Sequence, residues 1–166
     1  MKKFAVIMMI LVASTSALVG CSNAPTKVET GSSETTQVEK APLEDLLNKM
    51  IEADIVRMPM PIDETLAQEA YHIDLETVDE YALAETGISP GPGLVVMAKA
   101  KDGQVDKVKE NMEALLQDKI GNAFYPDERE AAESAEIIVE GNYVALFILH
   151  DEVEAEAIQM FEDSSK

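Results

Sequence analysis

Four carboxylates lie close together near the middle of the chain: Asp74, Glu76, Asp79 and Glu80. Carboxylate oxygens are the ligands that hard cations such as Ca²⁺ prefer. This group is therefore a candidate cation site. The sequence has no alternating Asp loop with a central glycine, as a calcium hand requires, and 32 Asp and Glu residues make close pairs unavoidable. A solvated edge is the more ordinary interpretation of the same cluster.

Groups suited to catalysis are few. Nucleophilic catalysis needs Ser, Cys or Thr beside a base, most often histidine. The chain has two histidines, His72 and His150, and neither belongs to a Ser-His-Asp signature or a His-Glu-x-x-His zinc motif. Met58 and Met60 are soft ligands that suit copper, but without a neighbouring His or Cys they are more typical of core packing. We expect no enzymatic activity and no cofactor.

The single cysteine, Cys21, closes the sequence Leu18-Val19-Gly20-Cys21. Two lysines and an uncharged, largely apolar run precede it, which is typical of a secretory signal and shorter than a membrane-spanning helix. A small residue before such a cysteine is similar to the lipobox of bacterial lipoproteins, in which the sulfur receives diacylglycerol. We expect cleavage of residues 1–20 and anchoring through Cys21 on the extracytoplasmic face of the cell membrane. Two acyl chains make such an anchor effectively permanent.

The segment from residue 21 to 41 is rich in Ser, Thr, Glu and Gln and has two large apolar residues, Val28 and Val38. It cannot bury a core, so we expect a disordered linker ahead of one domain at 42–166. The formal net charge of −19 repels nucleic acid and anionic lipid, so we expect no nucleic-acid partner. The membrane is then reached through the lipid on Cys21.

Apolar periodicity and turn residues predict the elements of the domain. Helical spacing predicts helices over residues 42–55, 63–71, 105–120, a short stretch after Tyr125-Pro126, and a last helix capped by Asp151. Apolar runs predict strands over 78–85, 94–98, 137–139 and 143–149, the last two joined by Gly141-Asn142. Two hairpins separated by helices favour an α+β fold: a single domain with an antiparallel sheet of about four strands and helices packed on one face.

Several stretches resemble a family of Gram-positive lipoproteins catalogued as domain of unknown function 4358. The matching stretches are the lipobox, residues 71–76, residues 99–103, Tyr125-Pro126 and residues 141–144. The Pro-Gly-Pro-Gly sequence at 90–93 departs from that pattern. The resemblance implies an extracytoplasmic lipoprotein domain, and it brings no assigned activity and no catalytic residue.

The loop from Gly87 to Gly93 is the least ordinary stretch of the predicted domain. Prolines restrict the backbone and so reduce the entropy lost on docking. We therefore predict a binding rim, with the loop residues Ile88, Pro90 and Pro92 and the aromatic anchors Tyr81 and Tyr143. A stiff connection between strands is the alternative and is slightly favoured.

Taken together, these patterns favour a non-enzymatic binding or accessory module that presents a surface to another envelope protein or a peptide. Two alternatives stay open: a cation- or small-ligand-binding lipoprotein, and a carboxylate-dependent hydrolase of the envelope. A hydrolase would need two carboxylates facing one cleft.

Overall fold

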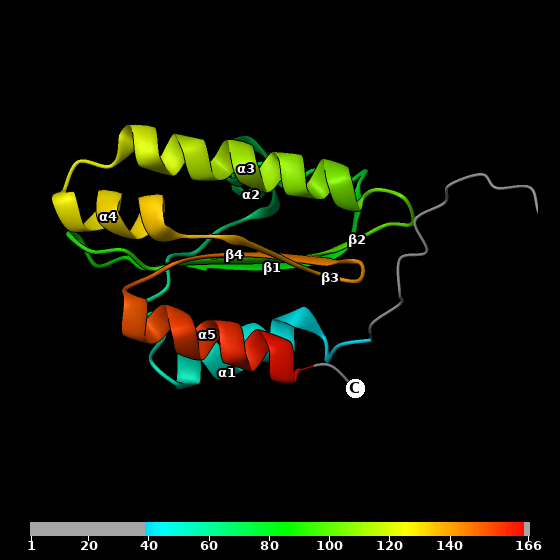
Figure 1. Ribbon diagram of the computed structural model, residues 1–166, viewed down its shortest axis with the longest axis horizontal. Coiled ribbons are helices and arrows are strands. Elements are labelled where there is room, and N and C mark those ends of the chain that lie inside the picture. Colours follow the sequence, from blue (N-terminus) through cyan, green and yellow to red (C-terminus); the bar gives the residue numbers. More distant parts are fainter. Residues whose placement is uncertain (1–38, 165–166) are drawn as a thin grey trace, which may run out of the picture. The chain divides into compact units, whose positions relative to one another are not determined.

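The computed structural model describes residues 39–164, which form one α+β domain around a four-stranded antiparallel sheet (Figure 1). The elements in chain order are α1 (Leu43–Glu52), α2 (Glu64–Tyr71), β1 (Val78–Glu85), β2 (Leu94–Ala100), α3 (Val105–Asn122), α4 (Pro126–Ser134), β3 (Ile137–Glu140), β4 (Tyr143–Ile148) and α5 (Asp151–Asp163). The predicted fold class and both hairpins are confirmed. The expected signal peptide, Cys21 and the linker up to residue 38 lie outside the described residues.

The strand order is β1-β2-β4-β3, so each hairpin supplies one edge strand and one central strand. The two central strands pair antiparallel, with Leu94 opposite Ile148 and Lys99 opposite Tyr143. One end of the sheet therefore carries the β1–β2 loop and the end of β4, and we call it the loop end. The other carries the β3–β4 turn, and we call it the hairpin end. Gly141 has φ 61° in that turn, the left-handed conformation for which glycine suits the position.

Helices cover both faces of the sheet, and the prediction of helices on one face is wrong. The helices α1 and α5 lie below the sheet in Figure 1, whereas α2, α3 and α4 lie above it. Met97 and Phe147 pack toward the first pair, and Val96 and Leu146 pack toward the other three. Every residue of β4 is buried, because a strand that is apolar on both faces needs cover on both.

The helix α1 ends three residues earlier than its apolar spacing predicts. Asp54 adopts φ 63°, and the amide of the next residue, Ile55, donates to the carbonyl of Met50 at 3.0 Å. This is the bond pattern that closes a helix when a left-handed residue follows it. Ile55 is still buried, but in the turn after the helix rather than on it. At the last helix, His150 is the N-cap and Asp151 is already helical, so the predicted cap lies one residue too late.

The folded contacts begin at Lys40, two residues before the predicted start of the domain. The Lys40 side chain is fully buried and donates from Nζ to the carbonyl of Phe161 at 2.7 Å. The same ammonium pairs with the carboxylate of Glu140 and lies 4.2 Å from the centre of the Phe161 ring. A polar linker composition gave no sign of this burial. Because Glu140 ends β3, the chain enters the domain at the hairpin end.

Candidate functional site

The β1–β2 loop is closed by contacts of Thr86. The Thr86 amide donates to the carbonyl of Gly93 at 2.8 Å, and its hydroxyl donates to the carbonyl of Arg57 at 2.6 Å. The same hydroxyl accepts from the amide of Ile88 at 3.2 Å. A Cβ at position 93 would lie 2.5 Å from the Thr86 Cγ2 atom, so the base of the loop requires glycine there.

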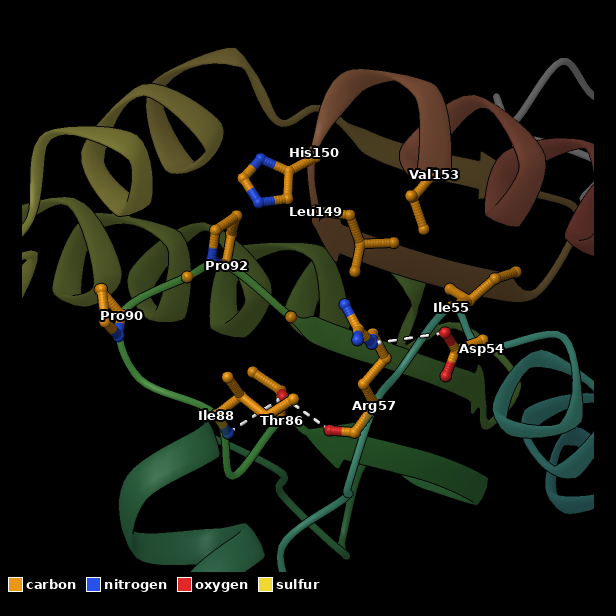
Figure 2. Close-up of a pocket in the computed structure, with 12 residues that line it drawn as sticks. Asp54, Ile55, Arg57, Thr86, Ile88, Pro90, Pro92, Leu149, His150 and Val153 are labelled. Carbon is orange, nitrogen blue, oxygen red and sulfur yellow. Dashed lines mark hydrogen bonds and ion pairs between the residues drawn. The ribbon is translucent and has the colours of Figure 1, made fainter.

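A first hollow of about 160 Å³ lies on the α5 side of this loop (Figure 2). The predicted rim residues Ile88, Pro90 and Pro92 line it together with Arg57 and His150. Figure 2 shows Arg57 directed across the hollow beside Asp54, and the Arg57 Nε atom is 3.3 Å from the Asp54 carboxylate. The loop therefore lines a concave surface, and three of the five predicted rim residues share it.

A second hollow of about 230 Å³ lies on the α3 and α4 side of the loop. The Glu85 carboxylate lines it and accepts from the Tyr71 hydroxyl at 2.5 Å and from Lys119 Nζ at 2.7 and 2.9 Å. Burial raises the pKa of Tyr71, and its bond to Glu85 raises the pKa further. These three residues come from α2, β1 and α3, so no local spacing in the sequence signals the group.

A third hollow, of about 490 Å³, lies between α4 and the start of α5. It is lined by four exposed carboxylates, Asp127, Glu130, Asp151 and Glu152, and we call it the acidic hollow. None of the four forms an ion pair with another residue in the range 39–164. The acidic hollow continues the first hollow, because His150 and two neighbouring apolar side chains line both.

Five large apolar side chains are exposed around the loop: Met58, Met60, Ile88, Phe124 and Tyr125, which we call the loop-end patch. Met58 is 74% exposed and Phe124 84%, so the expectation that the methionines fill a core is wrong. Among the described residues, seven large hydrophobic side chains are exposed, and five of them belong to this patch. Such concentration marks an interaction surface more often than scattered exposure does.

Hydrogen bonds connect the parts of the loop-end patch. The amide of Gly87 donates to the carbonyl of Met58 at 2.9 Å. On the other side of the loop, the Glu128 carboxylate accepts from the amide of Gly91 at 3.3 Å and from the amide of Tyr125 at 3.4 Å. The segment before α2, the loop and the α3–α4 connection are therefore held together as one surface.

The two predicted aromatic anchors lie elsewhere. Tyr143 is 1% exposed and pairs with Lys99 at the hairpin end, so its assignment to the rim is wrong. Tyr81 stands opposite Ala98 within β1 and lines a separate hollow near α1. The reason is register: Tyr143 begins β4, and only the end of that strand lies beside the loop.

The predicted cation cluster does not converge. Asp74 accepts from the amide of Glu76 at 2.9 Å within its own turn, and Glu80 accepts from the amide of Leu43 at 2.5 Å at the start of α1. In the part of the chain that the structure describes, no group of three or more His, Cys, Asp or Glu side chains is placed to hold a metal ion. Asp74 and Glu80 therefore act on different segments, and the four carboxylates do not form the site that the sequence suggested.

The structure thus defines a single α+β domain whose hollows and exposed apolar side chains gather at one end of its sheet. The family described as Domain of unknown function (DUF4358) matches residues 52–149, and the chain belongs to this family. The resemblance to that domain, inferred from short stretches, is confirmed. No curated protein and no solved structure matches the chain. Among the described residues, no helix is both long and apolar enough to cross a membrane.

Proposed function

We propose that this protein is a bacterial lipoprotein, held on the outer face of the cell membrane by lipid on Cys21, and that it serves as a non-enzymatic binding module of the cell envelope. The support for the anchor is the sequence alone: a charged start, an apolar run and a small residue directly before the sole cysteine. The support for binding comes from the domain.

The loop-end patch is the observation that carries the binding proposal. Its apolar side chains stand in solvent at the loop end, while the chain enters the domain through Lys40 at the hairpin end. A domain tethered at one end leaves the opposite end accessible to a partner. Aromatic and methionine side chains are enriched in the centres of protein interfaces, and this patch contains both.

The two hollows beside the loop favour a macromolecular partner over a small ligand or a substrate, whereas the acidic hollow, at about 490 Å³, is as large as a small-molecule site. The two hollows that flank the loop measure about 160 and 230 Å³, below the range of about 300–1,000 Å³ that is usual for small-molecule sites. In the second hollow, Glu85 is engaged by Tyr71 and Lys119, and Glu128 accepts from two backbone amides. In this second hollow, therefore, neither carboxylate is free for the acid and base steps of a hydrolase.

The anchor is tested by Cys21→Ser. The wild-type protein should fractionate with membranes and incorporate radioactive palmitate, and the variant should lose both properties. Unchanged fractionation and labelling of the variant would refute the anchor.

Binding is tested by photo-crosslinking in intact cells. A photoreactive amino acid replaces Phe124 in the loop-end patch, and the matched control replaces Val139, an exposed residue of β3. We expect an envelope protein to be captured from position 124 and not from position 139. Replacement of Ile88, Pro90 and Pro92 by Ser should abolish this capture and leave the melting temperature nearly unchanged. If neither position captures a protein, the binding module is refuted.

A further inference from the structure

We propose that the partner of the loop-end patch is a basic segment of a polypeptide, with apolar side chains that pack on the patch and Lys or Arg side chains that enter the acidic hollow. This inference rests on the proposed function and specifies the chemistry of its partner. The apolar patch indicates where docking occurs, and the charge beside it selects the occupant.

The acidic hollow adjoins the patch directly. Tyr125 of the patch is the N-cap of α4, and the same helix supplies Asp127 and Glu130. On the other side, Ile88 of the patch and His150 line the first hollow, and His150 also lines the acidic hollow. One extended segment that lies along the Pro-Gly-Pro-Gly loop would therefore contact both.

The cations of this region are already paired. Arg57 lies 3.3 Å from Asp54, Arg129 lies 3.7 Å from Glu133, and Lys119 binds Glu85. The four carboxylates of the acidic hollow have no such partner among residues 39–164. Negative potential is thus left beside the exposed apolar side chains, and complementary charge steers association and sets which partners bind.

Charge also excludes other occupants of the patch. A second copy of the chain carries the same formal charge of −19 and would place its own acidic surface against this one. An anionic lipid surface is repelled for the same reason. Of the occupants that expose apolar groups, a basic polypeptide segment is the one that this surface attracts.

Stabilisation of the helix dipoles is another explanation for the carboxylates of the acidic hollow. Asp127, Asp151 and Glu152 lie in the first turns of α4 and α5, where a carboxylate stabilises the helix dipole. Glu130 lies beyond the first turn of α4 and has no such explanation. If stabilisation of the helices were their only role, their removal would lower stability and leave binding of a basic segment unchanged.

The test measures binding of fluorescent peptides to the full mature chain by anisotropy. The probe is a short peptide of alternating Lys and Leu, and two controls replace every Lys by Glu or every Leu by Ser. Only the Lys-Leu peptide should bind well. Its affinity should fall by about tenfold or more as salt rises from about 50 to about 500 mM, because added ions screen exposed charges.

A pair of charge variants separates the proposed site from the general acidity of the protein. The site variant carries Asp127→Asn, Glu130→Gln, Asp151→Asn and Glu152→Gln. The control removes equal charge from exposed acids outside the three hollows: Asp106→Asn, Glu156→Gln, Glu162→Gln and Asp163→Asn. The site variant should bind the Lys-Leu peptide about tenfold more weakly than wild type, since each of several exposed ion pairs contributes a fraction of this factor. The control should bind within about twofold of wild type.

The inference is overturned if both charge variants weaken binding equally, or if the Lys-to-Glu peptide binds as tightly as the Lys-Leu peptide. In cells, the segment captured from position 124 should carry net positive charge. Capture of an acidic segment, of a second copy or of this chain's own N-terminal segment would refute the basic partner and leave the binding module standing. If no protein is captured from either position, both the binding module and its basic partner are refuted.

Discussion

Replacement of Lys40 by Met tests whether the domain is closed at its hairpin end by a buried ammonium. Lys40→Met keeps a long apolar side chain and removes the charge. The carbonyl of Phe161 keeps a donor, because the Ser164 hydroxyl also donates to it at 2.6 Å. The carboxylate of Glu140 loses the cation that pairs with it.

The expected loss of stability is about 2 kcal/mol. A hydrogen bond to a charged group contributes about 1.5–3 kcal/mol, and the Glu140 side chain is 27% exposed, so solvent reduces the upper part of this range. Loss of the cation over the Phe161 ring acts in the same direction. Against a typical domain stability of about 5–15 kcal/mol, the change is large enough to measure.

Urea denaturation of the chain from residue 21 to residue 166 provides the assay. The midpoint should fall by about 1 M at an unchanged slope, since the slope follows the surface exposed on unfolding. Lys49→Met is the control, because Lys49 is exposed on α1, and its effect should stay within about 0.5 kcal/mol. In a double-mutant cycle with Glu140→Gln, the coupling between the two residues should be about 1 kcal/mol or more. A Lys40→Met variant within about 0.5 kcal/mol of wild type would refute the reasoning.

Limited proteolysis checks the same contact by an independent route. Trypsin should cleave quickly after Lys27, in the expected linker, and only slowly after Lys40, whose side chain is buried. Equal cleavage rates at the two lysines would place the start of the folded domain after Lys40.

Tyr71→Phe should cost about 1.5 kcal/mol in urea denaturation, because Glu85 loses one donor but keeps another. Burial and the bond to Glu85 raise the pKa of Tyr71 above its ordinary value of 10.0. The contribution of Tyr71 to wild-type stability should therefore be constant below pH 10 and fall above it, where the unfolded chain ionises first. The Tyr71→Phe variant should fall less steeply, and identical slopes would contradict this. Gly93→Ala should cost about 1–3 kcal/mol through collision with Thr86, whereas Gly121→Ala, with open space around its Cβ, should stabilise α3 by up to about 1 kcal/mol. Thermal melts of the two variants that shift in the same direction would refute the difference in packing.

Local patterns in the sequence determined most of the secondary structure. The predicted strand at 78–85 coincides with β1, and Asp63 caps α2 by accepting from the amide of Leu66 at 2.8 Å, as its residue type suggests. Gly141-Asn142 forms the predicted turn. These features depend on residues that are neighbours along the chain, and local propensity and turn chemistry therefore suffice to predict them.

Features that depend on distant residues were decided by the tertiary structure. Burial of Lys40 depends on contacts with Glu140 and Phe161, which are about 100 residues or more away in the sequence. The polar composition around Lys40 therefore could not predict its burial. Asp54 follows α1 in a left-handed conformation. Glycine is the usual residue in that conformation, and because the sequence has Asp there, the end of the helix could not be predicted from it.

The candidate site also has one part that the sequence predicted and another that only the tertiary structure determined. The proline loop was identifiable from its composition, because prolines and glycines constrain the backbone wherever they occur. Strand pairing then placed Tyr143 at the opposite end of the sheet. Backbone contacts of the loop and the packing of α4 brought Met58, Phe124 and Tyr125 to the loop instead. The register of two antiparallel strands and the packing of helices on both faces set these positions, and both arise from contacts between residues far apart in the chain.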